Sequence, residues 1–178
     1  MALQITDTQE STKFIEHLNL TIDFDGLCLI NEFFITFSRF ECALKASGFA
    51  NGNVDKVEPN WDTFTSSIKQ SFDNNQRTEP INIAIEYLSN NPPKIQNYEN
   101  DQLGWRKRDF QNNVPLINKL SLSIRDVRNN LFHGGKFNGN YEKDVSRNYK
   151  LLKYSIEILN HWLNLNKNVR ENFQQPIE

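Results

Sequence analysis

The side chains best suited to chemistry lie in residues 128–135, which read RNNLFHGG. Arg128, Asn129 and His133 fall within about one and a half turns of a helix, and two glycines follow them. A guanidinium can bind two oxygens of one phosphate, and an imidazole can donate or accept a proton near neutral pH. We therefore expect this segment to hold a phosphate, orient a ribose and move a proton.

The helix that carries this segment limits how its side chains can meet. On an ideal helix, Arg128 and His133 lie about 140° apart around the axis, so they do not sit side by side. Either the arginine wraps around the helix, or the helix ends at Phe132 and His133 swings towards it. The glycines favour the second alternative because they readily adopt positive φ. A histidine in the last turn also feels the negative end of the helix dipole, which favours its protonated form.

The composition is that of an ordinary globular domain, with 178 residues, 38% hydrophobic and 24% charged. We expect one domain spanning residues 1–178, with residues 1–22 as a peripheral segment. A net charge of −2 gives no overall attraction to nucleic acid, so polyanion binding has to come from a local basic patch. The polar amino terminus and the charges within residues 27–40 argue against a secretory signal and a membrane span. These features predict a cytoplasmic protein that does not contact a membrane.

Hydrophobic periodicity predicts an all-α bundle of four to five helices with a long final helix. The predicted helices cover about residues 25–47, 61–72, 78–91, 114–132 and 141–166. Residues 50–60 and 92–112 show no helical period and no convincing strand pattern, so we expect a loop in each. The long loop, residues 92–112, contains the densest basic cluster of the chain, which is Trp105, Arg106, Lys107 and Arg108.

Two of the predicted helices have apolar residues on two sides, which is typical of helices buried on both. In the first helix the second side includes Cys28 and Cys42, which lack metal-ligand spacing and which we expect to be reduced core residues. In the final helix the second side includes Ile158 and Trp162. In so small a protein, we expect one of the two sides of the final helix to meet a second subunit. His161 has no partner at catalytic spacing, and we interpret it as structural.

The order of Arg128, Asn129 and His133 resembles the R-N-x-x-x-H signature of HEPN domains. In that family the motif also ends a helix in an all-α bundle of about this size. The glycine after the histidine and the long final helix fit the same pattern. Residues 37–45 are also similar to stretches of bacterial HEPN-like proteins. The specific residues of the resemblance are nevertheless confined to residues 128–135.

The resemblance implies a metal-independent endoribonuclease of a toxin–antitoxin or antiviral defence system, with an antitoxin or another defence protein as a possible partner class. Such proteins form homodimers in which the motifs of two protomers face each other across one cleft. Carried over to this chain, Arg128 and His133 are catalytic and Asn129 supports them. A ribose 2′-OH would attack its own phosphodiester, with His133 moving the proton and Arg128 stabilising the phosphorane. Neither a cofactor nor a metal is implied.

Other cations are candidate contacts for the RNA substrate. Arg125 shares a helix face with the motif histidine. The basic cluster combines an aromatic ring with cations, which suits base stacking and neutralisation of the RNA backbone. Its cations are Arg106, Lys107 and Arg108. Solvated surface charges would explain all four residues as well.

Two other functions stay open at this point. A non-catalytic HEPN-like module would use the motif as an anion clamp for a nucleotide, an RNA or a protein partner. A helical dimerisation scaffold would use it only as a polar helix end, worth about 0.3–1 kcal/mol of stability. Turnover of RNA distinguishes the ribonuclease from both.

Overall fold

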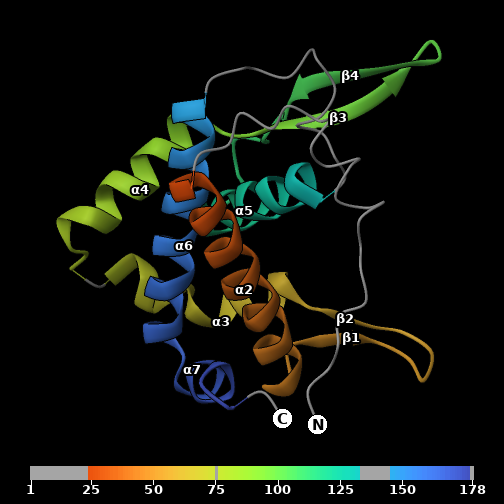
Figure 1. Ribbon diagram of the computed structural model, residues 1–178. Coiled ribbons are helices and arrows are strands. Elements are labelled where there is room, and N and C mark those ends of the chain that lie inside the picture. The colour runs from red at the N-terminus through yellow and green to blue at the C-terminus, as the bar shows by residue number, and fades with distance from the viewer. Residues whose placement is uncertain (1–23, 75, 133–144, 177–178) are drawn as a thin grey trace, which may run out of the picture.

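The computed structural model describes residues 24–74, 76–132 and 145–176. Its elements in chain order are α2 (Phe24–Ala46), β1 (Ala50–Gly52), β2 (Val57–Pro59), α3 (Trp61–Asn74), α4 (Glu79–Asn90), β3 (Lys94–Glu99), β4 (Gln102–Lys107), α5 (Leu116–Phe132), α6 (Val145–Leu165) and α7 (Lys167–Phe173). The described part is mainly helical, and two small antiparallel sheets project from the helical body (Figure 1). Within these ranges, no helix combines the length and the apolar content that crossing a membrane requires.

Helix α6 is the central element of the core. It contacts all the other described helices, α2, α3, α4, α5 and α7. Both of its apolar sides contain fully buried residues, with Leu152 and Leu159 on one and Ile158 and Trp162 on the other. The chain's own helices therefore cover most of both sides, one of which the sequence assigned to a second subunit. The two-sided pattern is explained within one protomer.

Helix α2 is buried on one side only. The predicted core side is confirmed, with four residues buried: Phe33, Phe37, Phe40 and Leu44. The prediction of a second buried side is wrong, because Cys28 and Cys42 are exposed free thiols and Ile35 is 54% exposed. The physical reason is that α6, not α2, occupies the centre, so among the described elements α2 packs against neighbours on one side alone. The predicted end of this helix is confirmed, since Gly48 follows it with a φ of 85°.

The first turn of α2 approaches α6 so closely that only glycine fits. A Cβ on Gly26 would lie 1.9 Å from Oη and 2.4 Å from Cζ of Tyr149. We predict that Gly26→Ala lowers the free energy of unfolding by about 1–3 kcal/mol, because the tyrosine ring or the helix has to move. Urea unfolding measures this. The control is Gly104→Ala, whose Cβ would meet only the side chain of Asn97, with Oδ1 nearest at 2.9 Å. A loss for Gly26→Ala no greater than for this control would contradict the prediction.

The prediction of loops at residues 50–60 and 92–112 is wrong, because each segment contains an antiparallel hairpin. The longer hairpin pairs β3 with β4, from Lys94 opposite Lys107 to Glu99 opposite Gln102. Its turn residues, Asn100 and Asp101, have φ values of 50° and 58°, as a two-residue type I′ turn requires. Both hairpins project from the same side of the helical body (Figure 1).

The long helix α6 is not the last, which corrects the predicted end of the chain. Asn166 ends its apolar pattern and begins α7, because the Asn166 side chain accepts a hydrogen bond from the Val169 amide at 3.1 Å. Arg39 of α2 donates hydrogen bonds to the backbone oxygens of Phe173 and Gln175. A cation at these carbonyls satisfies the carboxyl end of α7 and fixes it to α2.

His161 of α6 packs at the edge of the core, in agreement with a structural role. Its ring centroid lies 6.2 Å from that of Phe72, and the Arg77 guanidinium lies 4.1 Å from the same Phe72 ring. Burial, followed by the positive charge of Arg77, lowers the pKa of His161 below its ordinary value of 6.5. At a pH between the lowered pKa of the folded chain and the ordinary pKa of the unfolded chain, His161 binds a proton only in the unfolded chain. Acid therefore disfavours folding in this range.

We predict that His161→Gln makes stability less sensitive to acid. Wild-type stability present above pH 6.5 decreases as the pH falls towards the lowered pKa of His161. The variant lacks the titrating group, so its loss over the same range is smaller. Urea midpoints at pH about 7.5 and about 5.5 measure the difference. Equal losses for the variant and the wild type would contradict the assignment.

Candidate functional site

Helix α5 positions the motif at the edge of the helical body. Its predicted apolar stripe is buried, with four residues at 4% exposure or less: Ile117, Leu120, Ile124 and Val127. The stripe fixes the rotation of the helix because these side chains must face the core. The polar residues of the last turns are thereby directed to the side and outwards.

Arg128 and Asn129 lie together in the last turns of α5. Nη1 of Arg128 donates a hydrogen bond to Oδ1 of Asn129 over 3.1 Å. The Arg128 guanidinium carbon lies 5.9 Å from the ring centroid of Phe37 in α2, within the range of a cation–π contact. Arg128 is half-buried and Asn129 is exposed. The guanidinium of Arg128 is therefore held between the Phe37 ring and the side-chain oxygen of the next residue.

The third motif residue cannot be placed in the same way. His133, with the two glycines that follow it, lies outside the described residues. The described part of α5 ends at Phe132, the residue directly before it.

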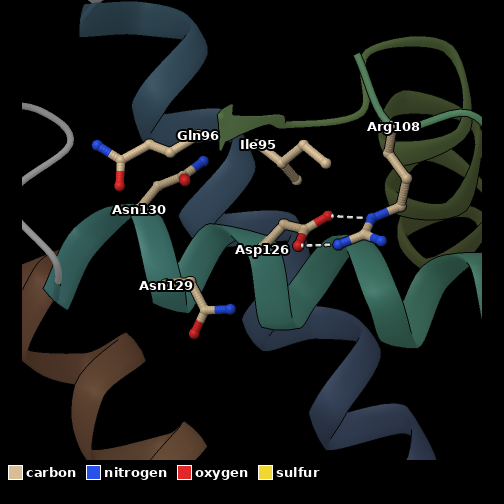
Figure 2. Close-up of a pocket in the computed structure, with 6 residues that line it drawn as sticks. All are labelled: Ile95, Gln96, Arg108, Asp126, Asn129 and Asn130. Atoms are coloured by element: carbon tan, nitrogen blue, oxygen red, sulfur yellow. Dashed lines mark hydrogen bonds and ion pairs between the residues drawn. The ribbon is translucent and has the colours of Figure 1, made fainter. Parts of the chain in front are cut away.

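Arg108, predicted to bind RNA, is engaged inside the chain by Asp126 of α5. Nε and Nη2 of Arg108 each donate to one carboxylate oxygen of Asp126 over 2.6 Å (Figure 2). The Asp126 side chain is 5% exposed and the Arg108 side chain 29% exposed. These hydrogen bonds raise the pKa of Arg108 further above its already basic value. The pair joins the end of β4 to α5.

The other cations predicted to contact RNA lie at different places, two of them on the hairpin of β3 and β4 and one on α5. Arg106 and Lys107 are both exposed but lie on β4, where neighbouring side chains point to opposite faces. Arg125 lies on the other side of α5, towards β2. The pKa of Glu58 in β2 is lowered mainly by its hydrogen bond and ion pair with Lys56, and further by the charge of Arg125. The cations therefore do not form one continuous patch.

A cavity beside the motif has no counterpart in the sequence prediction. Its volume is about 300 Å³, and it lies between β3 and α5. Six residues line it: Ile95, Gln96, Arg108, Asp126, Asn129 and Asn130. Asn130 is 5% exposed and donates from Nδ2 to the backbone oxygen of Lys94 over 2.7 Å. The only sequence signal for this cavity is the polar run that follows the apolar stripe of α5.

The arrangement suits ligand binding by polar groups. In the described ranges, no three acidic, histidine or cysteine side chains gather where they could hold a metal ion. The site instead offers an oriented guanidinium, several amides and a paired carboxylate. These groups can bind an anion and form hydrogen bonds to a neutral ligand.

Comparison of the chain with protein-family models, with curated proteins and with solved structures finds no match.

Proposed function

We propose that this protein is a metal-independent endoribonuclease of the HEPN type. The observation that supports the proposal is the hydrogen bond from Arg128 to Asn129 in the last turns of α5. This hydrogen bond orients the guanidinium through Asn129, the residue that supports the catalytic arginine according to the family resemblance. His133 follows four residues after Asn129 in the sequence, as the resemblance requires.

In the proposed reaction, the 2′-oxygen of a ribose attacks the adjacent phosphorus. The bond from phosphorus to the 5′-oxygen breaks, so the products are a 2′,3′-cyclic phosphate and a 5′-hydroxyl. Arg128 binds the non-bridging oxygens, whose charge increases in the phosphorane. His133 acts on the proton of the attacking or the leaving oxygen. In a symmetric dimer, the histidines of the two protomers divide these tasks.

The proposal includes a homodimer. We expect its interface to lie away from α6, because the other helices of the same chain already pack around α6. The outer side of α2 offers apolar surface, since Leu27, Phe34 and Ile35 are 46%, 44% and 54% exposed. Arg128 packs against Phe37 of the same helix. Because Arg128 contacts α2, pairing through this helix would place the motif of each protomer near the interface. Sedimentation velocity tests this, and a monomer at every concentration would contradict the dimer.

The biological setting proposed is that of a cytoplasmic toxin or antiviral effector, restrained by an antitoxin or another protein of its defence system. This setting is what the family resemblance implies, and it agrees with the harm that unrestrained cleavage of RNA would do to the host cell. Induced expression in a bacterial host should stop growth for the wild type and not for Arg128→Ala.

The direct test is incubation of purified protein with RNA in EDTA. We expect fragments that end in a 2′,3′-cyclic phosphate, identified by mass spectrometry. Intact RNA under all conditions, or cleavage only after a divalent metal is added, would contradict the proposal.

The cavity between β3 and α5 favours one alternative, a binding module without turnover. Such a module would bind a nucleotide, an RNA or a protein partner next to an anion clamp at Arg128. It predicts saturable binding that His133→Gln preserves and no cleavage by the wild type. A substrate cut by the wild type and left intact by His133→Gln would exclude it.

A further inference from the structure

The lining of the cavity between β3 and α5 carries no net charge in the described part of the chain. Its only ionised groups, Arg108 and Asp126, neutralise each other through two hydrogen bonds. A phosphate would meet a guanidinium that is already bound by a carboxylate. A metal ion would find a single carboxylate, both oxygens of which accept from Arg108. The cavity therefore suits a neutral ligand.

The amides of the cavity provide hydrogen-bonding groups in defined positions. Nδ2 of Asn130 donates to the Lys94 oxygen, which directs that amide and leaves its Oδ1 as an acceptor. Gln96 extends on the same side of α5 as Asn130 (Figure 2), and its amide makes no hydrogen bond within the described residues. Amides of this kind bind the edges of nucleobases, and Ile95 offers an apolar contact for a ring face.

The acceptors in the cavity select among the bases. Oδ1 of Asn130 and the carboxylate oxygens of Asp126 are all acceptors whose orientation is fixed. At position 6 of a purine or position 4 of a pyrimidine, adenine and cytosine present an amino group to such acceptors, whereas guanine and uracil present a carbonyl oxygen there. The volume of about 300 Å³ is at the lower end of the range for small-ligand sites, which suits one planar ring system.

Asn129 connects this cavity to the motif arginine. Asn129 is one of the residues that line the cavity, its side chain points away from Gln96 and Asn130 (Figure 2), and its Oδ1 accepts the hydrogen bond from Arg128. Arg106, exposed on β4, is the cross-strand partner of Ile95. An RNA with one base in the cavity would therefore have cations on two sides for its neighbouring phosphates, one of them the motif arginine.

We propose that the cavity between β3 and α5 binds an adenine or cytosine base of the RNA substrate and so gives cleavage a base preference. This inference rests on the proposed ribonuclease function. The base enters between Gln96 and Asn130, and its exocyclic amino group donates to the fixed acceptors. The adjoining phosphate then lies towards Arg128.

Binding to uncut RNA tests this inference. In a His133→Ala background, fluorescence anisotropy measures the affinity for adenine, cytosine and uracil homopolymers of about ten nucleotides. We expect the adenine or the cytosine homopolymer to bind about tenfold more tightly than the uracil homopolymer. Adding Gln96→Ala should remove this preference, because the Gln96 amide is the group that holds the base against the acceptors of Asn130 and Asp126. The matched control is Gln102→Ala at the tip of the same hairpin, which should keep it.

The possible outcomes separate this inference from the proposed function. Equal affinity for the three homopolymers, no binding, or an equal effect of Gln96→Ala and Gln102→Ala would overturn the base pocket, even if the wild type cleaves RNA. A preference that depends on Gln96 would support the pocket, even if the wild type cleaves nothing. Displacement of RNA by a neutral peptide, with no base preference, would assign the cavity to a protein partner instead and overturn the inference.

Discussion

Replacing His133 by alanine is expected to lower the rate of RNA cleavage by about a thousandfold. The proposed reaction needs a group that moves a proton near neutral pH, and His133 is the only motif residue that can do so. Initial rates on a labelled RNA, measured in EDTA, give the effect. The thermal unfolding temperature should stay close to that of the wild type, because the sequence predicts His133 at a helix end, where a histidine contributes only about 0.3–1 kcal/mol.

Two further variants show whether the loss is specific to the motif. Arg128→Ala should lose as much activity as His133→Ala, because the phosphorane would lack its bidentate cation. His161→Gln replaces a histidine packed on Phe72 and should leave the rate unchanged at pH about 7.5. Equal rates for the wild type and His133→Ala, both folded, would remove the catalytic role of the motif.

Replacing Asp126 by alanine is expected to lower the free energy of unfolding by about 3 kcal/mol. The Asp126 side chain is 5% exposed, and its carboxylate is bound through both oxygens to Arg108. The substitution leaves the half-buried guanidinium without its partner and loosens β4 from α5. Urea unfolding measures the loss, and the double variant Arg108→Ala/Asp126→Ala should recover part of it.

The control for this prediction is an exposed ion pair on α3. Asp73 pairs with Lys69 one turn away, with side chains 44% and 48% exposed. Asp73→Ala should cost well under about 1 kcal/mol, because solvent screens such pairs. A loss for Asp126→Ala as small as for Asp73→Ala would show that the pair does not hold the hairpin to the helix.

The sequence predicted the elements whose own residues determine them. The stripe from Ile117 to Val127 repeats over two heptads, and it fixes both the helix and the side that faces the core. The face of α2 that holds Phe33 and Phe40 was predicted for the same reason. The second side of α2 was misjudged because the pattern of one helix does not show how many neighbours it has. That number depends on α6, which lies more than a hundred residues later in the chain.

The hairpin of β3 and β4 was missed because its stability comes from partners distant in the sequence. Its sequence lacks the alternation of apolar and polar residues that indicates a half-buried sheet. Two of its large apolar residues, Tyr98 and Leu103, are 71% and 47% exposed in the structure. Its turn is Asn-Asp and not the more readily recognised Asn-Gly. Two side chains of α5 hold the hairpin in place: Asp126 accepts hydrogen bonds from Arg108, and Asn130 donates one to the backbone oxygen of Lys94.

The candidate site was predicted in part, for the same physical reason. Arg128 and Asn129 are neighbours in the chain, so their hydrogen bond is a local feature. The Arg108–Asp126 pair spans eighteen residues, and no spacing rule for helices or strands predicts it. The cavity also needs the hairpin that the sequence did not reveal, and so it could not be predicted either.

The most direct test of the account is cleavage of one RNA that carries a single 2′-deoxy substitution at its main cleavage site, with EDTA present. The 2′-oxygen is the proposed nucleophile. The account therefore predicts that the wild type cuts the all-ribose RNA, leaves a 2′,3′-cyclic phosphate, and does not cut the substituted linkage. Cleavage of the substituted linkage at the rate of the all-ribose one would contradict the proposed chemistry.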